Sequence, residues 1–288
     1  MEPQKRIIYE PSYLIRDAAR RALKGKMSLV FASAVVYMLC LSVPVIIVEQ
    51  ITGLWSFLER AADDYLAQMA NDPTPASIYE WAQSYQGQGS VSLATWLFLL
   101  LVPGPLTLGL SAIWLRVVRK QESYPDMVLS GFGNFFRAML LHFTRSVFMA
   151  LWAILFIIPG IVAYYRYSLA FFLLIDNPDM APLAAISLSK YYMRANKGNR
   201  FFLDLSFLGW FALAAVVLAF ASGYAMDFLN FAGVTSSLFL SQLVTGILGS
   251  VIFAPVYAYR GVAAAEFYHR VICRDPASFK DPLKLPVK

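Results

Sequence analysis

Histidine is nearly absent from this sequence, which contains only His142 and His269 in 288 residues. Neither has a second histidine four residues away, the spacing at which helical histidines share a metal ion. The chain also lacks a phosphate-binding glycine loop ending in lysine and a Gly-x-Ser-x-Gly nucleophile motif. We therefore expect no catalytic residues, no cofactor and no metal ion, and a protein that is not an enzyme.

Cysteine is equally scarce. Cys40 lies inside the first apolar run and Cys273 in the basic C-terminal tail. The topology derived below keeps the two thiols apart, so we expect no disulfide framework.

Charged residues make up only 15% of the chain, whereas hydrophobic residues make up 59%. Soluble domains carry about 25% charged and about 45–50% apolar residues. The apolar residues form long uncharged runs separated by short basic stretches, a pattern typical of spanning helices. The net charge of +6 does not form one patch, because the basic residues flank the apolar runs. We therefore expect a lipid-bilayer environment and no nucleic-acid partner.

Six apolar runs approach the roughly 20 residues that a helix needs to cross a bilayer. We place them at 27–48, 91–115, 138–158, 161–175, 202–221 and 238–259. The predicted fold class is all-α, a polytopic membrane helix bundle with about six transmembrane helices.

The distribution of lysine and arginine orients these spans. Residues 1–26 carry seven basic residues, and others follow the second span, occupy the linker 176–200 and continue from Arg260 to the end. The loop 49–90 has one basic residue, Arg60, against six acidic ones. Because basic loops stay in the cytoplasm, six spans with both termini inside satisfy every loop. We divide the chain into a cytoplasmic basic segment (1–26), a transmembrane bundle (27–268) with its outer loop (49–90), and a cytoplasmic tail (269–288).

Two Pro-Gly motifs predict helix breaks within the apolar runs, because proline removes a backbone donor and glycine favours turns. The first is Pro103, Gly104 and Pro105, and the second is Pro159 and Gly160. We place a tight turn between two antiparallel spans at the second motif. Since the run 161–175 is short, a re-entrant hairpin is the alternative to a full span.

Extramembrane segments also show helical periodicity, which predicts amphipathic interfacial helices. In the outer loop, apolar residues recur from 54 to 69, a stop follows at Asp72-Pro73, and Ile78, Trp81 and Tyr85 suggest a second short helix. This part of the loop is either a cap over the bundle or a binding surface for a peptide or lipid. On the inner side we predict a helix over 182–196, ended by the Lys197–Arg200 stretch.

Charged residues inside apolar runs are the candidates for a site, because charge in hydrocarbon is costly and usually has a partner or a function. Arg166 lies in the fourth run, and the polar side chains around it could form a pocket. The candidate intramembrane site comprises Arg166, Tyr164, Tyr167, Ser168, Arg145 and Asp204. Two alternatives remain: Arg145 snorkels to the inner interface, and Arg166 is only a buried arginine satisfied by tyrosines and free carbonyls.

Several segments together resemble an uncharacterised family of bacterial integral-membrane proteins, domain of unknown function 975. They are IIPGIVAYYRYSLAFFLLIDNPDMAPLAAISLSK, KGNRFFLDLSFLGW and AEFY, and the resemblance runs from Arg21 to Tyr268. The chain departs from the family pattern at Arg194–Asn196, which look inserted, and at Ala163, where a basic residue is common. The family is similar to membrane domains that accompany glycerophosphodiester phosphodiesterases, and this resemblance implies a helical module without catalytic residues.

Three functions compete on this basis. The first is a non-enzymatic module of the bacterial cytoplasmic membrane, acting in envelope homeostasis, membrane assembly or resistance to membrane-active peptides. Its partners would be anionic inner-leaflet lipids and a membrane protein or a second copy of the chain. The second is a transporter or flippase for an anionic lipid or small molecule near Arg166, and the third is a lipid-acting enzyme that brings His142, Asp204 and Arg166 together.

Overall fold

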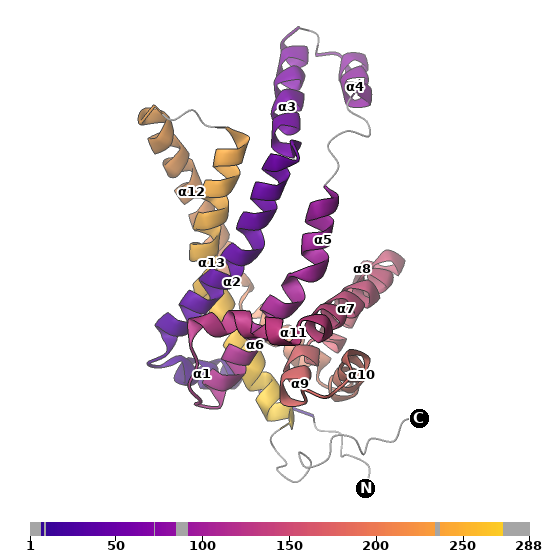
Figure 1. Ribbon diagram of the computed structural model, residues 1–288, viewed down its shortest axis with the longest axis vertical. Coiled ribbons are helices and arrows are strands. Elements are labelled where there is room, and N and C mark those ends of the chain that lie inside the picture. The colour runs from indigo at the N-terminus through magenta and orange to yellow at the C-terminus, as the bar shows by residue number, and fades with distance from the viewer. Residues whose placement is uncertain (1–6, 9, 72, 85–91, 234–236, 273–288) are drawn as a thin grey trace. The chain divides into compact units, whose positions relative to one another are not determined.

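A computed structural model describes residues 7–8, 10–71, 73–84, 92–233 and 237–272 (Figure 1). All regular secondary structure within these residues is helical, and they contain no strand. The helices before the loop at residue 120 are α1 (Ser12–Leu23), α2 (Met27–Ile51), α3 (Leu54–Asn71), α4 (Pro75–Ser84), α5 (Leu93–Leu101) and α6 (Pro103–Val118). After it come the 3₁₀ helix η1 (Pro125–Asn134), α7 (Phe135–Leu155), α8 (Ile157–Arg166), α9 (Ala170–Asp176), α10 (Pro182–Tyr192), α11 (Lys197–Leu205), α12 (Leu208–Phe231) and α13 (Leu238–Ile272).

Six segments of these helices are long and apolar enough to cross a membrane. They are Met27–Ile51, Leu93–Val118, Pro125–Leu155, Ile157–Asp176, Lys197–Phe231 and Leu238–Ile272. This confirms the predicted all-α bundle with six candidate spans, and by length and composition the chain is a multi-pass membrane protein.

The chain forms two compact units. Unit 1 contains the described residues of Met1–Tyr37, Leu100–Ala214 and Phe253–Lys288, and unit 2 contains those of Met38–Leu99 and Ala215–Ile252. The described residues of the sequence-based segments 1–26 and 269–288 therefore belong to unit 1, and segment 27–268 contributes to both units. Most of that last segment, residues 273–288, lies outside the described residues, as do Asp72 and Tyr85.

The two Pro-Gly motifs behave differently. α5 ends at Leu101 and α6 begins at Pro103, so a break falls at the first motif. At the second, α7 ends at Leu155 and the extended residue is Phe156, with φ −160° and ψ 150°. Pro159 and Gly160 lie inside the first turn of α8, not at the turn between the helices. This corrects the predicted break, and the reason is that proline fits the first helical turn, where its missing N–H has no intrahelical acceptor.

Gly160 instead allows α8 to lie close to α7. A Cβ at this position would be 2.9 Å from both Cα and Cβ of Ala153 on α7. The tip of the resulting antiparallel hairpin is apolar and open, with Ile154, Phe156 and Ile158 each more than 70% exposed. Such a tip is suited to lipid rather than to water.

The linker after α9 also differs from its prediction. α10 ends at Tyr192, four residues before the end of the predicted helix 182–196. Lys197 is the first residue of α11, although the Lys197–Arg200 stretch was predicted to end a helix. Asn196 precedes the first turn of α11, and its side chain accepts a hydrogen bond from the backbone N–H of Ile8 at 2.9 Å. The Lys-Gly-Asn-Arg stretch is therefore the start of a helix, and this start is anchored to the N-terminal segment.

A helix also forms within the basic N-terminal segment. α1 buries Ile15, Ala19 and Leu23, which recur every four residues and form one helical face. This face packs in unit 1, where α1 contacts α6 and α11. Tyr259 of α13 donates a hydrogen bond to the carbonyl oxygen of Arg16 at 2.9 Å.

Unit 2 contains the two helices predicted in the outer loop, α3 and α4, which contact each other. The rings of Tyr65 and Trp81 meet at 4.9 Å between centroids. Glu49, near the end of α2, is only 3% exposed and accepts hydrogen bonds from the hydroxyls of Thr95, Ser92 and Thr52. Unit 2 therefore holds a buried carboxylate surrounded by hydroxyl groups.

Candidate functional site

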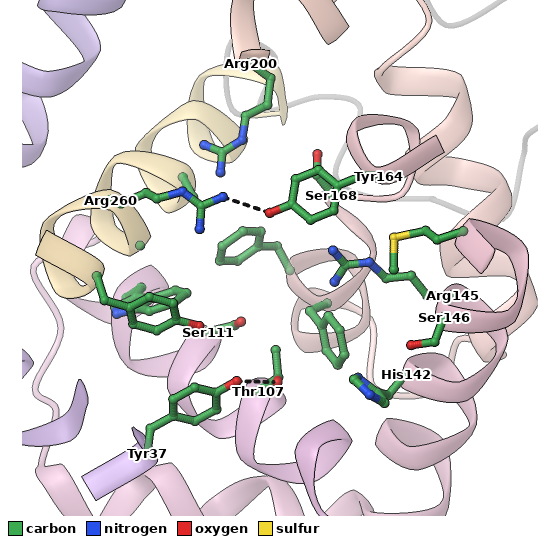
Figure 2. A pocket seen from close by; sticks show the side chains of 17 residues that line it. Tyr37, Thr107, Ser111, His142, Arg145, Ser146, Tyr164, Ser168, Arg200 and Arg260 are labelled. Carbon is green, nitrogen blue, oxygen red and sulfur yellow. Dashed lines mark hydrogen bonds between the residues drawn. The ribbon is translucent and has the colours of Figure 1, made fainter. Parts of the chain in front are cut away.

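Unit 1 contains a polar cavity of about 250 Å³. Figure 2 shows its lining side chains, which come from α2, α6, α7, α8, α9, α11, α13 and the turn after α8. They are Tyr37, Thr107, Ser111, Trp114, His142, Arg145, Ser146, Met149, Tyr164, Ser168, Phe171, Phe172, Arg200, Tyr257, Arg260, Gly261 and Ala264. Three arginines on three different helices thus surround one space.

Arg260 is the best-satisfied of the three. Its Nε and Nη2 donate to the two carboxylate oxygens of Asp204 at 3.0 and 3.1 Å, which is a bidentate pair. Its Nη2 also donates to the hydroxyl of Tyr164 at 2.8 Å. Asp204 is one turn along α11 from Arg200 (Figure 2 shows both arginines), so the same carboxylate reaches two guanidiniums.

Arg200 is only partly satisfied. Its Nη2 lies 3.2 Å from Asp204 Oδ1, while its buried Nη1 has no hydrogen-bond partner among the described residues. The residue is 5% exposed, so bulk water does not take that place. A buried donor without an acceptor is costly, and such groups in native structures call for an explanation.

Arg145 has the fewest polar contacts. Its guanidinium lies 5.4 Å from the ring centroid of Tyr164 and 5.8 Å from that of Phe171. No ion pair joins it to a carboxylate of the described chain, and its buried Nε has no hydrogen-bond partner there. Figure 2 shows the Arg145 and Arg260 side chains extending toward the cavity from opposite sides.

The remaining wall combines aromatic rings with hydroxyl groups. The Tyr37 and Thr107 hydroxyls are 3.2 Å apart, and Tyr257 stacks on Tyr37 and meets Trp114 edge-on. The indole Nε1 of Trp114 is buried and lacks a hydrogen-bond partner within the described residues. Ser111, like Thr107, comes from α6. Three lining residues, Arg145, Arg200 and Trp114, thus carry a buried donor without a partner within the described residues.

The charges around the cavity do not balance. Arg145, Arg200 and Arg260 carry three positive charges, and Asp204 is the one carboxylate that pairs with them within the described residues. Two formal positive charges are left in a site surrounded by apolar helices. Because isolated buried charge is unfavourable, this arrangement suits a ligand that brings negative charge and hydrogen-bond acceptors.

The structure brings together only part of the predicted site. Arg145, Tyr164 and Ser168 line the cavity, and Asp204 holds two of its arginines. Arg166 is not a lining residue; its carbonyl oxygen accepts a hydrogen bond from Ser189 at 3.0 Å.

Tyr167 also lies off the cavity. It is buried, with its ring 6.0 Å from that of Phe148. Arg166, two residues after Tyr164, projects to another side of α8, and α8 ends there, so Tyr167 and Ser168 lie in the turn that follows it.

Sequence reasoning missed Arg200 and Arg260, which had been assigned to the linker and the tail. One signal was present: Asp204 in an apolar helix requires a counter-charge, and Arg200 precedes it by one helical turn. Arg260 could not be found in this way, because nothing local pairs it with a residue 56 positions earlier.

His142 is one of the three residues that the lipid-enzyme hypothesis brings together, and it lines the cavity. Of His142, Asp204 and Arg166, only His142 lies on the cavity wall. Within the described residues, no group of three histidine, cysteine or acidic side chains could hold a metal ion.

The fold and the cavity define an α-helical multi-pass membrane protein with an arginine-lined polar site. Residues 154–275 match the protein family described as "Protein of unknown function (DUF975)". This match supports the resemblance deduced from the sequence, over a shorter range than the expected 21–268, and it includes α8 to α13. No curated protein and no solved structure matches the chain.

Proposed function

We propose that this protein is a non-enzymatic membrane module that binds an anionic group in the arginine-lined cavity of unit 1. The observation that carries the proposal is that three arginines line the cavity and only one carboxylate of the described residues, Asp204, pairs with them. Three lining residues also carry a buried donor that has no partner within the described residues: Arg145 Nε, Arg200 Nη1 and Trp114 Nε1. Each is a donor and none is an acceptor. An anion supplies the missing acceptors and offsets the excess positive charge at the same time.

The cellular setting is part of the proposal. We infer a bacterial cytoplasmic membrane with both termini in the cytoplasm, supported by the basic inner segments and the acidic outer loop. Anionic inner-leaflet lipids are the expected partners, with a membrane protein or a second copy as further candidates. A binding module is consistent with a role in envelope homeostasis, membrane assembly or peptide resistance. It is also consistent with kinship to the membrane domains that accompany glycerophosphodiester phosphodiesterases.

The proposal is tested by thermal unfolding of the purified chain in zwitterionic nanodiscs. Sodium phosphate, sodium acetate or added phosphatidylglycerol is titrated against the native chain, Arg145→Met and Arg166→Met. We expect at least one anion to raise the unfolding temperature of the native chain and of Arg166→Met. Arg145→Met should bind on the order of tenfold more weakly, the worth of a hydrogen bond to a charged group.

Arg166→Met is the matched control because it removes an arginine from the same region without touching the cavity wall. Equal anion responses in all three proteins, or none in any of them, would contradict the proposal. Release of inorganic phosphate from a phosphorylated lipid would contradict its non-enzymatic part.

Transport of the same anion is the second candidate. The observation in its favour is that discontinuous helices line the cavity: α6 starts just after the break at Val102, and α8 ends at Arg166, just before Ser168. Interrupted helices often form substrate sites in transporters. Reconstituted vesicles should then show anion flux or lipid scrambling that Arg145→Met abolishes and Arg166→Met retains. If the protein binds the anion but shows no flux, transport is excluded and only the binding-module proposal is supported.

A further inference from the structure

The excess positive charge around the cavity also indicates how much negative charge its ligand carries. Resting on the function proposed above, we propose that the cavity selects a phosphomonoester dianion, carried by a lipid headgroup or by a small soluble ester. Two formal positive charges remain after Asp204 is paired with Arg200 and Arg260. A dianion neutralises both, whereas a carboxylate or a phosphodiester leaves one buried positive charge without a partner.

The donors also match the shape of a phosphate. A terminal phosphate presents three strongly accepting oxygens, and the lining residues that carry unsatisfied donors lie on three helices, α6, α7 and α11. Arg145 and Arg200 present planar guanidiniums, which bind phosphate oxygens in pairs. A carboxylate offers two oxygens in one plane, whereas a terminal phosphate offers three that point in different directions.

The cavity volume limits the rest of the ligand. Drug-sized ligands occupy pockets of about 300–1,000 Å³, and this cavity is smaller, at about 250 Å³. It has room for a phosphate with a short polar stem. Hydroxyls of Thr107 and Ser111 lie on one wall for that stem, beside the rings of Tyr37 and Tyr257. Acyl chains of a lipid would have to remain outside.

Two matched lipids and two matched soluble anions test the selection. Binding is measured at about pH 8, where a phosphomonoester with a second pKa near 6 is a dianion. Nanodiscs contain phosphatidic acid or phosphatidylglycerol with identical acyl chains, and separate titrations use glycerol 3-phosphate or acetate. We expect the dianion of each pair to bind at least tenfold more tightly than the monoanion, in the native chain and in Arg166→Met.

Two variants of Arg145 separate charge from geometry. Arg145→Met should abolish the dianion preference. Arg145→Lys keeps the charge but lacks the planar fork, so its affinity should fall between those of Arg145→Met and the native chain. Each variant is first shown to be folded by its elution profile and a cooperative melt.

Each outcome has a fixed meaning. Preference for phosphatidic acid alone supports the proposal with a lipid source, and tight binding of glycerol 3-phosphate supports it with a soluble source. If phosphatidylglycerol and acetate bind as tightly as the dianions and still depend on Arg145, the cavity binds anions but dianion selection is wrong. If no anion shows dependence on Arg145, both this inference and the proposed function fail.

Discussion

At the scale of one residue, Arg145 indicates a binding site because its buried side chain lacks a hydrogen-bond acceptor within the described residues. Its guanidinium is held over two aromatic rings, and its Nε has no acceptor within the described residues. Cation–π contacts contribute roughly 0.5–2 kcal/mol, while an unsatisfied buried donor costs about 1–3 kcal/mol. The side chain therefore contributes little to folding, and a ligand explains its presence better.

This balance predicts an unusual stability effect. Without any anion, Arg145→Met should leave the unfolding temperature unchanged or raise it by roughly 2–4 °C, because methionine fills similar space without polar atoms. Differential scanning calorimetry in zwitterionic nanodiscs measures this change. A drop of several degrees would show that Arg145 has a structural role, and Arg166→Met serves as the comparison.

Glu49 of unit 2 leads to a prediction of the opposite kind. Its buried carboxylate accepts a hydrogen bond from the hydroxyl of Thr95, which is 2% exposed. It accepts a second one, at 3.4 Å, from the hydroxyl of Thr52, which is exposed. Thr95→Val should lower the free energy of unfolding by about 1–3 kcal/mol, because it leaves a buried acceptor with fewer donors. Thr52→Val, the control, should change it little. Similar effects of the two substitutions in denaturant titrations would argue against this role for Thr95.

Single residues also mark the limits of reading the sequence. Tyr164 and Arg145 were identified because polar groups stand out in apolar runs, and both line the cavity. Arg260 was assigned to the tail because arginines at the ends of spans usually face the headgroups. Its partner Asp204 is distant in sequence, so only tertiary packing reveals the pair. Depth in the membrane can be predicted from sequence, but pairing across helices cannot.

At the scale of elements, helix breaks depend on where a proline falls within a helix. The motif at Pro103 coincides with a break because α6 begins on it. The motif at Pro159 was predicted as a turn but lies within the first turn of α8, and the turn is at Phe156. The length of the uncharged apolar runs predicted the six spans. The boundary of a helix depends on local backbone geometry, which a Pro-Gly pair does not determine.

The packing of η1 against α6 gives an element-scale prediction. A Cβ at Gly131 would collide with the carbonyl oxygen of Pro105, while a Cβ at Gly133 of the same helix would meet nothing within 4 Å. Gly131→Ala should therefore destabilise the protein by about 1–3 kcal/mol through overpacking. Gly133→Ala should be neutral or slightly stabilising. Thermal melts of both variants make the comparison, and equal stability would show that η1 can move away from α6.

The ends of three helices in unit 1 are joined by one buried carboxylate. Asp176, at the end of α9, receives two hydrogen bonds of 2.7 Å from Arg119, just after α6, and one of 2.7 Å from Tyr268 of α13. Asp176→Ala should lower the free energy of unfolding by on the order of 3 kcal/mol, because it leaves a guanidinium and a phenol without their acceptor. Tyr268→Phe removes one bond and should cost less. If chemical denaturation showed a larger loss in the free energy of unfolding for Tyr268→Phe than for Asp176→Ala, this role of Asp176 would be wrong.

At the scale of the whole molecule, the topology can be tested on residues that the structure describes. With Cys40 and Cys273 replaced by serine, single cysteines are placed at Ala82 of α4, Glu122 and Asp179, all exposed positions. The proposed topology predicts that a membrane-impermeant maleimide labels Ala82→Cys in intact cells. It should label Glu122→Cys and Asp179→Cys only after lysis. Labelling of all three from the same side would require a different number of crossings.

The burial of the cavity arginines has a consequence for the salt dependence of lipid binding. The basic residues of α1, such as Arg20 and Arg21, are exposed, and their attraction to an anionic leaflet acts through water, where ions screen it within about 10 Å at 0.1 M salt. Arg200 is 5% exposed and largely beyond the reach of such ions. High salt should therefore displace lipid attracted to α1 while leaving a headgroup in the cavity, so that two modes of lipid association can be separated by ionic strength alone.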